Sequence, residues 1–359
     1  MSQTSLDFIV ARNDLRDHKL VETVLPALVE GQILLKVDKF AFTSNNVTYA
    51  AFGEAMQYWD FFPAPEGYGR IPVWGFADVV ESKCEGIAVG ERVYGYWPMS
   101  SHVVLTPSRI RPAGFVESGA HRSHLALVYN QYSRVAGDAT YDAAHEDAQS
   151  LLGPLFKTAF FIDDLIADND FFGAKAVVLS SASSKTALGV AYLMSQRPDI
   201  EVIGLTSSGN RAFVEGTGYY DRVVTYDAIG TIPADLPVVF VDMAGNAEVI
   251  AELHNHFRDA MKYSCVVGGT HWEARGVGKA LPGPKPVFFF APTQIAKRVE
   301  EWGPGGIEQR YGAKWTAFLA SVPAWMKVVS GRGERDMAKV YLDMLDGRVS
   351  PSEGHMLSV

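Results

Sequence analysis

Cysteine is scarce in this chain. Only Cys84 and Cys265 occur among 359 residues, and they lie far apart in the sequence. Two distant cysteines cannot form a disulfide framework, and a structural zinc site built from four cysteines is impossible. Such sparse use of cysteine is typical of proteins in a reducing compartment, so we expect a cytoplasmic location.

Long hydrophobic runs are lacking as well. The strongest apolar run, residues 287–292, is far shorter than the roughly 20 residues that a membrane helix needs. Residues 1–14 lack the basic and then apolar stretches of a secretory signal peptide. Positive charge is outnumbered, because 32 Lys and Arg stand against 41 Asp and Glu for a net charge of −9. We therefore expect a soluble protein that binds a small molecule rather than nucleic acid or a membrane.

Two common catalytic patterns are also absent. None of the 15 tyrosines has a lysine four residues later, which the proton-donating pair of a short-chain dehydrogenase would require. No Gly-x-Ser-x-Gly stretch occurs, so a serine hydrolase is not indicated. The histidine pairs at 121 and 124 and at 254 and 256 are more typical of surface histidines than of a metal site, and we predict no bound metal.

What the sequence does contain is an ordered change of hydrophobic pattern. Strand patterns predominate in the first part of the chain, with runs at 31–40, 71–82 and 91–96 that are bounded by turn residues. After a break near residue 153, predicted helices and short apolar strands alternate. A chain of this length and pattern predicts two domains.

The second region predicts an α/β fold with a doubly wound parallel sheet, because six predicted strands are accompanied by four predicted helices. We expect the strands at 176–179, 201–206, 222–225, 238–242, 264–267 and 287–290, and the helices at 154–168, 185–196, 210–217 and 247–261. Beyond the sheet we expect helices at 314–327 and 334–345. A last strand at 355–359 is expected to pair with the first domain.

The first turn of such a fold usually holds the cofactor phosphates, and here its sequence is unusual. Residues 175–189 have the pattern of a strand, a turn and a helix start, and a helix N-terminus attracts a pyrophosphate. In place of glycines the turn has Ser183, Ser184, Lys185 and Thr186. We predict that these residues bind the pyrophosphate and that the Lys185 ammonium replaces glycine contacts. The alternatives are an ordinary capped helix and a P-loop, which the missing glycines argue against.

The end of the second strand indicates which dinucleotide is bound. NAD enzymes usually have Asp or Glu here for the ribose 2′-hydroxyl, whereas this chain has Ser207, Ser208 and Arg211. Hydroxyl and guanidinium donors suit a 2′-phosphate, so we predict NADP(H) as the cofactor, with Arg211 as the main discriminator. The next carboxylate, Glu215, is expected about two helical turns away from the ribose side. The alternative is a solvated surface arginine.

Several further motifs follow one another along the chain. The most specific is the turn Val-Gly-Glu-Arg-Val-Tyr-Gly at 89–95, and others lie at 31–37, 72–82, 157–161, 223–226, 241–245 and 266–269. Together they resemble the medium-chain dehydrogenase/reductase superfamily, in particular its zinc-free quinone oxidoreductases and enoyl reductases. The altered phosphate loop, the long segment 121–149 and the Trp-rich tail depart from the pattern, so we expect a remote subfamily.

The resemblance implies a GroES-like β-rich domain, residues 1–152 completed by 305–359, and a Rossmann domain, residues 153–304. It implies further cofactor-binding residues: Asn45, Thr158, Tyr226, Ala244, Gly245, Val267 and Gly268. It also implies that Tyr49 faces the nicotinamide and is the catalytic residue. The alternative for Tyr49 is a packed core aromatic.

At the positions of the superfamily's zinc ligands, this chain offers residues 43–49 and 74–76, which contain no Cys, His or Glu. We therefore expect a zinc-independent NADPH-dependent oxidoreductase that transfers hydride to a carbonyl-conjugated C=C bond or a quinone. Tyr132 and Asn130, in a polar aromatic run, are expected to line the substrate cleft. A metal-independent carbonyl reductase or alcohol dehydrogenase, and a non-catalytic binding protein with this fold, stay open as alternatives.

The apolar run 285–292 also bears on assembly. It is expected to form the last strand of the parallel sheet, and an exposed edge of this kind invites pairing with the same strand of a second copy. Related quinone reductases associate in this way. We therefore predict a homodimer.

Overall fold

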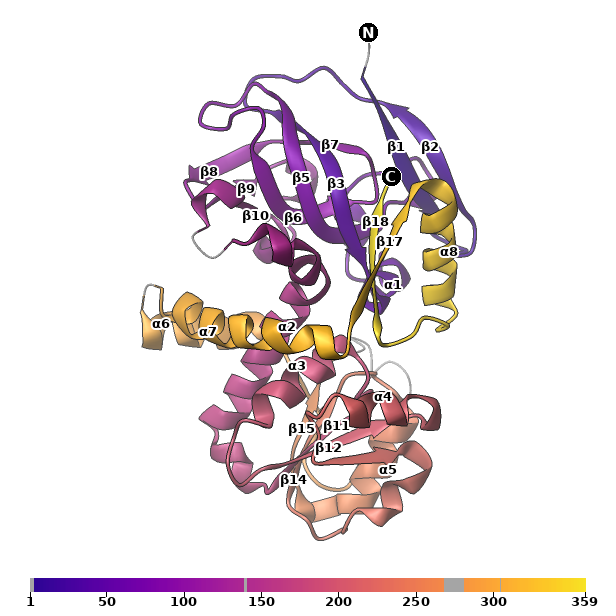
Figure 1. The fold of residues 1–359 in the computed structure, drawn as a ribbon, viewed down its shortest axis with the longest axis vertical. Helices are drawn as coiled ribbons and strands as arrows, with labels where there is room; N and C mark the ends of the chain where they lie inside the picture. Colours follow the sequence, from indigo (N-terminus) through magenta and orange to yellow (C-terminus); the bar gives the residue numbers. More distant parts are fainter. Residues whose placement is uncertain (1–2, 139–140, 268–280, 304) are drawn as a thin grey trace. The chain divides into compact units, whose positions relative to one another are not determined.

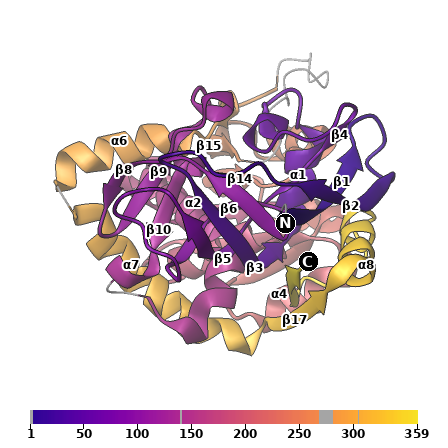
Figure 2. The same ribbon diagram turned by 90° about the horizontal axis from the view of Figure 1, so that it is seen from above.

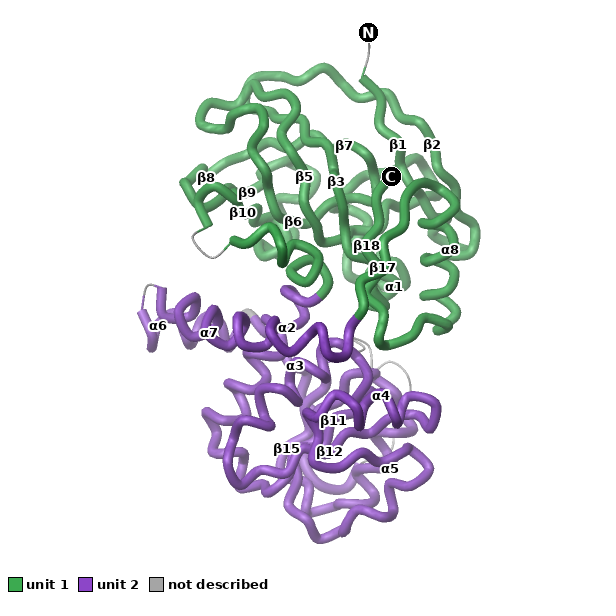
Figure 3. The backbone as a smooth tube through the Cα atoms, viewed as in Figure 1, with its two compact units in different colours: residues 1–151, 327–359 green, residues 152–326 purple. Residues whose placement is uncertain are grey.

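The computed structural model describes residues 3–138, 141–267, 281–303 and 305–359, apart from the side chain at position 292. The chain divides into two compact units (Figure 3). Unit 1 comprises residues 1–151 and 327–359, and unit 2 comprises residues 152–326. Each unit is described below by itself.

Unit 1 is a β-rich body with two sheets (Figure 1). The smaller sheet has three antiparallel strands in the order β2 (His18–Val24), β1 (Thr4–Ala11) and β4 (Tyr68–Gly69). The larger sheet has nine strands. Eight follow the order β17 (Lys327–Arg332), β18 (Glu353–Ser358), β3 (Ile33–Phe42), β5 (Pro72–Ser82), β6 (Arg92–Pro98), β10 (Gln131–Arg134), β9 (Gly114–Glu117) and β8 (Pro107–Arg111), and β7 (His102–Leu105) also pairs with β3.

The end of the chain is part of this larger sheet. Strand β18 pairs antiparallel with β3, with Met356 opposite Ala41, and parallel with β17. This confirms the predicted pairing of the last strand with the first domain. Helix α8 (Gly333–Leu345) lies beside β1 and β2 in both views (Figures 1 and 2), and the buried Tyr341 ring packs edge-on against Phe8 at 5.6 Å. Burial of such aromatic side chains fixes the tail to the sheet.

Helix α1 (Ser44–Ala51) begins directly after β3. Thr43 and Asn46 form a capping box, in which each side chain bonds the other residue's backbone N–H. Asn46 also donates to the Pro72 carbonyl at 2.8 Å, so the helix start is tied to β5. The capping box and the bond to Pro72 together hold the start of the helix, so that its next turn, with Tyr49, packs against the core of unit 1.

Unit 2 contains a six-stranded sheet whose strands are all parallel. Its order is β13 (Arg222–Thr225), β12 (Glu201–Thr206), β11 (Ala176–Leu179), β14 (Val238–Asp242), β15 (Met261–Val266) and β16 (Val287–Phe288). The helices are α3 (Lys185–Met194), α4 (Arg211–Gly216), α5 (Ala247–Phe257), α6 (Ala291–Trp302) and α7 (Gly306–Ser321), and helix α2 (Glu146–Asp168) starts in unit 1 and belongs to unit 2 from residue 152 onward. The predicted doubly wound sheet is thus confirmed, with the central strands fully buried.

Two expectations about the tail and the domain boundary are corrected by the structure. Residues 305–326, which we had assigned to the first domain, belong to unit 2, because Phe318 on α7 stacks on Phe156 of α2 with ring centroids 4.4 Å apart. The helix predicted at 314–327 ends at Ser321, and Lys327, the last residue of that prediction, begins strand β17 (Lys327–Arg332). Edge pairing with β18 here outweighs the helical spacing of the apolar residues.

Helix α2 also differs from the prediction, because it begins at Glu146 and not at residue 154. Glu146 is buried and receives two hydrogen bonds from Arg92, at 2.6 and 2.7 Å. Lys39 bonds the neighbouring Asp147 at 2.6 Å. These charged contacts, all within unit 1, fix the first turn of the helix, and Pro154 lies inside it. Among the described helices, none has the length and apolar character required to cross a membrane.

Candidate functional site

The predicted phosphate loop connects β11 to α3 and is a tight turn built without glycine. Ser181 adopts a left-handed backbone conformation with φ of 46°, the position where glycine would be expected. Ser184 caps α3 by accepting a hydrogen bond from the Ala187 amide at 3.3 Å. The first amides of α3 have no carbonyl partner within the helix, which makes this terminus chemically suited to an anion.

Contacts from two tyrosines hold this loop in place. The Tyr226 phenol oxygen accepts a hydrogen bond from the Ser181 amide at 2.8 Å, and Tyr220 donates to the Ala182 carbonyl at 2.8 Å. Gly204 on β12 allows the close approach: an added Cβ would lie 2.7 Å from the Tyr220 ring and 2.9 Å from Ala182. In the usual fingerprint, glycines of the loop itself allow close packing. Here Gly204 of the next strand, β12, allows part of that packing.

The end of β14 is organised around a buried carboxylate. Asp242 accepts hydrogen bonds from Ser180 at 2.6 Å, from the Gly245 amide at 2.7 Å and from the Ala244 amide at 3.3 Å. Burial raises the pKa of Asp242, and these three donors lower it in part. The amides of Ala244 and Gly245, predicted to serve the cofactor, are therefore engaged by Asp242, so any cofactor contact from this turn would come from other atoms.

At the end of β12, the predicted 2′-phosphate residues lie on the surface. Arg211 begins α4, and its Nε donates to Glu215 at 2.8 Å. The two side chains are 54% and 48% exposed. Glu215 was expected about two helical turns away from the ribose side. It lies four residues after Arg211 on the same helix, at the spacing where two side chains of a helix meet. Ser207 directly precedes the short helix that starts at Ser208, and Asn210 donates to Ser183 at 3.2 Å, so this strand end contacts the phosphate loop.

The remaining predicted cofactor residues of unit 2 are placed as follows. Thr158 donates to the Pro154 carbonyl within α2 at 3.1 Å. The Val267 amide donates to the Asp242 carbonyl at 2.8 Å, directly after β15. Gly268 lies outside the described residues. Lys185 and Thr186 form the first turn of α3, as predicted.

The candidate catalytic residue in unit 1 belongs to a group of buried and half-buried aromatic rings that we call the tyrosine cluster. Its members are Tyr49, Tyr58, Tyr96, Tyr129 and Trp74. The Tyr49 ring lies 4.6 Å from Tyr58, 5.7 Å from Tyr96 and 6.2 Å from Tyr129, and Tyr96 lies 5.0 Å from Trp74, all measured between ring centroids. The Tyr49 side chain is only 5% exposed.

The surroundings of the Tyr49 oxygen are hydrogen-bond donors. Asn45, one turn earlier on α1, donates to it at 2.8 Å. Burial and the neighbouring Tyr58 raise the pKa of Tyr49 to about 12, although donors from Trp74, Tyr129 and Asn45 act against this rise. Tyr49 therefore stays protonated at neutral pH. Because its oxygen already accepts, its own proton can be donated to another acceptor.

The structure does not bring the two predicted substrate residues to a cleft. Tyr132 is 2% exposed, stacks on Phe115 at 5.3 Å, and donates to the Tyr96 carbonyl at 2.6 Å. Asn130 is 3% exposed, and both ends of its amide bond Arg122. We correct this expectation: Tyr132 on β10 and Asn130, the residue just before that strand, are both buried within unit 1.

Sequence reasoning missed the other members of the tyrosine cluster. Tyr129 lies in the same polar aromatic run as Tyr132, and Tyr58 and Tyr96 come from different segments. The Tyr96 hydroxyl is fully buried and makes no hydrogen bond to any described residue. Only the fold brings these rings together, and the one signal in the sequence was the density of tyrosine in otherwise apolar segments.

The described residues offer few ligands for a metal ion. Within the described ranges, no three His, Cys, Asp or Glu residues lie close enough together to hold an ion. Near Tyr49, the side chains are amides, phenols and an indole. None of these is a usual zinc ligand.

Comparison with solved structures defines the class of fold. CurA from Vibrio vulnificus, crystallised with NADPH, has a TM-score of 0.65 at 12% identity, over 99% of both chains. A quinone oxidoreductase from Coxiella burnetii gives 0.57 at 13% identity, over 99% of this chain and 100% of that one. The enoyl reductase CurK gives 0.55 at 13% identity, over 99% of both. The chain thus has the two-part fold of medium-chain reductases, as the resemblance implied.

The sequence itself matches one family model, described as "Protein of unknown function (DUF2855)", over residues 40–350. The chain belongs to this family. No curated protein matches it in sequence. The expected remote subfamily is consistent with this result.

Proposed function

We propose that the protein is a zinc-independent NADPH-dependent reductase acting on a carbonyl-conjugated C=C bond or on a quinone. The observation that carries the proposal is the Tyr49 phenol, kept neutral by burial and surrounded by donors, in a fold shared from end to end with CurA, which was crystallised with NADPH. A neutral phenol with a free proton suits a substrate oxygen that becomes negative during reduction.

The residues of unit 2 fit a dinucleotide phosphate. The α3 N-terminus and the hydroxyls of Ser183, Ser184 and Thr186 offer donors at the end of β11, and Lys185 adds positive charge. Arg211, with Ser207 and Ser208, would hold the 2′-phosphate. When bound, NADPH would supply the hydride. Tyr226 and Val267, which follow β13 and β15, and Thr158 on α2 complete the proposed contacts.

The residues of unit 1 would act on the substrate oxygen. Tyr49 would donate its hydrogen bond as charge develops there, and Asn45 would orient the phenol through its 2.8 Å bond to the same oxygen. Tyr129 and Tyr58 pack around Tyr49 and keep water from it. The described side chains around Tyr49 include no usual zinc ligand, so this donor would take the part that the Lewis acid plays in zinc-dependent members of the fold.

The test is a pair of measurements on the whole protein. Quenching of tryptophan fluorescence would give the affinities for NADPH and NADH. Loss of NADPH absorbance would then follow turnover of a quinone, an α,β-unsaturated ketone and a simple ketone. Binding and turnover of the first two compounds support the proposal. Turnover of the simple ketone alone indicates a carbonyl reductase, and binding without turnover of any indicates a binding protein.

Homodimerisation through the parallel sheet and a cytoplasmic location are also part of the proposal. Strand β16 lies at the sheet edge, and Val287 and Phe288 are 45% and 40% exposed, although the strand has only two residues. Both cysteines are free thiols, which suits a reducing compartment. Light scattering at micromolar concentration is expected to give twice the monomer mass, and a strict monomer would refute the dimer.

A further inference from the structure

The tyrosine cluster contains more phenols than the proposed function uses. Tyr49, Tyr58 and Tyr129 come from α1, η1 (Tyr58–Phe61) and η3 (Leu127–Tyr129), all within unit 1. Their ring centroids lie 4.6 Å apart for Tyr49 and Tyr58, 6.2 Å for Tyr49 and Tyr129, and 6.0 Å for Tyr58 and Tyr129. The Tyr129 ring is edge-on to both of the others, at 83° and 82°. Each hydroxyl can donate one hydrogen bond and accept others, so these three phenols can serve one another.

The hydrogen bonds between these hydroxyls run in one direction. Tyr58 donates to Tyr129, and Tyr129 donates to Tyr49, which also accepts from Asn45 at 2.8 Å. Burial raises the pKa of all three phenols, and the bonds between them add smaller effects: the bond from Tyr129 lowers the pKa of Tyr49, its acceptor. Among the three, Tyr49 alone donates to neither of the others. Its proton is therefore the one left for a substrate oxygen.

A buried arginine fixes the segments that carry Tyr58 and Tyr129. Arg122 is 1% exposed, and it donates through Nη2 to the Tyr129 carbonyl at 2.9 Å and through Nε to the Asn130 amide oxygen at 2.6 Å. Its guanidinium also lies 5.1 Å from the ring of Phe61, the last residue of η1. A buried charge with directed contacts to both segments leaves them little freedom to move apart. The position of Tyr129 against Tyr58 is thus built into the core.

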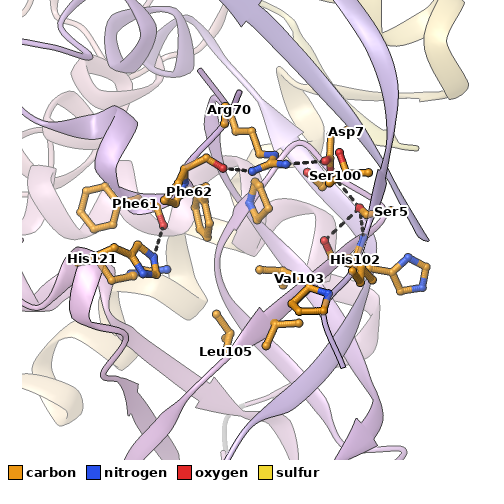
Figure 4. A pocket seen from close by; sticks show the side chains of 18 of the residues that line it. Ser5, Asp7, Phe61, Phe62, Arg70, Ser100, His102, Val103, Leu105 and His121 are labelled. Carbon is orange, nitrogen blue, oxygen red and sulfur yellow. Dashed lines mark hydrogen bonds and ion pairs between the residues drawn. The ribbon is translucent and has the colours of Figure 1, made fainter. Parts of the chain in front are cut away.

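The segment that begins at Tyr58 is anchored again beside a cavity of about 490 Å³ (Figure 4). There His121 bonds the Phe61 carbonyl at 3.3 Å, and Arg70 bonds the Pro63 carbonyl. None of the three phenols lines this cavity, so it gives them no direct contact with water.

Tyr129 is the phenol of the three that has the most contact with solvent. Tyr49 and Tyr58 are 5% and 8% exposed, whereas Tyr129 is half-buried. Its oxygen has two lone pairs, so it can accept from Tyr58 and from a water molecule. Tyr129 also lies in residues 121–149, the segment that departs from the superfamily pattern, so the resemblance gave no indication of a role for it.

We propose that Tyr129 is a positioning residue of the reduction: it passes a proton to Tyr49 as Tyr49 gives its own to the substrate oxygen. This inference rests on the proposed function. Hydride addition leaves an enolate or a hydroquinone anion. The Tyr49 O–H bond then breaks as the substrate O–H bond forms, the Tyr129 proton moves to the Tyr49 oxygen, and solvent returns one proton to Tyr129. The two electrons come with the hydride, the added proton comes from water, and the protein ends unchanged. Tyr58, by donating to Tyr129, directs the Tyr129 proton toward Tyr49.

The kinetic test uses Tyr129→Phe, which keeps the ring and loses the hydroxyl. With the quinone or unsaturated ketone that the wild type reduces, kcat is expected to fall about 10-fold, while KM and NADPH affinity stay unchanged. In mixtures of H₂O and D₂O, wild-type kcat should follow a curve against the deuterium fraction, because more than one proton moves, and the variant should follow a straight line. A normal kcat in the variant, or a straight line for the wild type, would overturn the relay and leave the proposed function standing. A wild type that reduces none of the compounds would overturn both.

A second measurement needs no substrate. Proton NMR of the whole protein with ¹³C-labelled tyrosine rings detects hydroxyl protons that hydrogen bonds protect from exchange with water. Tyr129→Phe is expected to shift the hydroxyl signals of both Tyr49 and Tyr58, since each loses a bond to Tyr129. The matched control is Tyr132→Phe, which removes a buried phenol that donates to the Tyr96 carbonyl at 2.6 Å and should leave both signals and kcat in place. Unchanged Tyr49 and Tyr58 signals in Tyr129→Phe would show that the three hydroxyls are not linked and refute the relay.

Discussion

The two units hold their candidate functional groups in opposite ways. In unit 1, Tyr49 is 5% exposed and is packed by aromatic rings from three other segments. In unit 2, Arg211 is 54% exposed and is paired with a neighbour on its own helix. A buried group has its proton affinity set by its surroundings, whereas an exposed charge is screened by solvent and salt. The chemistry of unit 1 should therefore be hard to change, and the cofactor preference of unit 2 easy.

The ion pairs of the two units also differ in burial. Glu146 is buried in unit 1 and bonds both Arg92 and Tyr141, at 2.6 and 2.7 Å. The pair of Arg211 with Glu215 in unit 2 joins two exposed side chains at 2.8 Å. Exposed pairs contribute about 0–1 kcal/mol, whereas breaking a buried pair costs several-fold more. Substitutions at these positions can therefore test the comparison directly.

The largest effect is expected for Tyr49→Phe. The variant loses the donor that meets charge in the transition state but keeps the ring, so turnover should fall about 10²-fold or more while NADPH affinity stays nearly unchanged. Steady-state kinetics with the quinone or unsaturated ketone found active, together with NADPH titration, measure both quantities.

The matched control for this prediction is Tyr132→Phe. It removes an equally buried phenol, one that donates to the Tyr96 carbonyl at 2.6 Å. This variant is expected to lose about 1 kcal/mol of stability and to keep its kcat. Normal turnover by Tyr49→Phe would show that Tyr49 serves packing only.

A stability effect of intermediate size is expected for Glu146→Gln. Burial alone would raise the pKa of Glu146, but hydrogen bonds from Arg92, Tyr141 and Lys39 lower it to about 2. A pKa lowered by folding gives stability that is present above the unfolded value and is lost as the pH falls toward 2. The variant should be less stable by about 3 kcal/mol at pH 7.

The pH dependence separates this charge effect from simple packing. The stability difference between wild type and Glu146→Gln in urea unfolding should shrink to roughly half at pH 3, because the unfolded carboxyl is protonated there. Asp147→Asn, at the half-exposed neighbour that bonds Lys39, is the control and should change little at either pH. An equal loss for Glu146→Gln at both pH values would contradict the charge explanation.

Much of the fold could be predicted from the sequence, because its signals are local. The strands at 176–179, 201–206, 222–225 and 238–242 were placed with their observed bounds, since short β-branched runs between turn residues have few alternatives. Helix α6 was missed, and β17 was not predicted either, since the helix predicted at 314–327 reaches only its first residue. Both depend on packing partners distant in the sequence: Arg298 of α6 bonds Asp164 of α2 at 2.7 Å, and β17 needs β18.

The candidate site was predictable only in part, for the same reason. Motif position alone selected Tyr49 and the turn at 183–186, and the structure places them on a helix and at a helix start. The tyrosine cluster joins five segments, and no single one of them reveals it. Tyr132 was chosen in place of Tyr129 because a run of polar and aromatic residues does not reveal which side chains face the core until the pairing of β10 is known.

The smallest effect is expected for the exposed pair of Arg211 and Glu215 in unit 2, and it concerns the affinity for NADPH. Arg211→Ala should lower NADPH affinity about 10-fold and leave NADH affinity almost unchanged, because only NADPH has the 2′-phosphate. The matched variant Glu215→Gln removes the carboxylate that holds Arg211 Nε at 2.8 Å, and with it a negative charge beside the proposed phosphate position. NADPH affinity should then rise a few-fold, as the modest strength of an exposed pair allows, again with no change for NADH. Both effects should weaken as salt rises, because screening acts on exposed charges. Titrations of both cofactors with wild type and the two variants, at low and high salt, give all of these values. Equal affinities of the wild type for NADPH and NADH, or an Arg211→Ala variant that loses both together, would show that Arg211 does not read the 2′-phosphate.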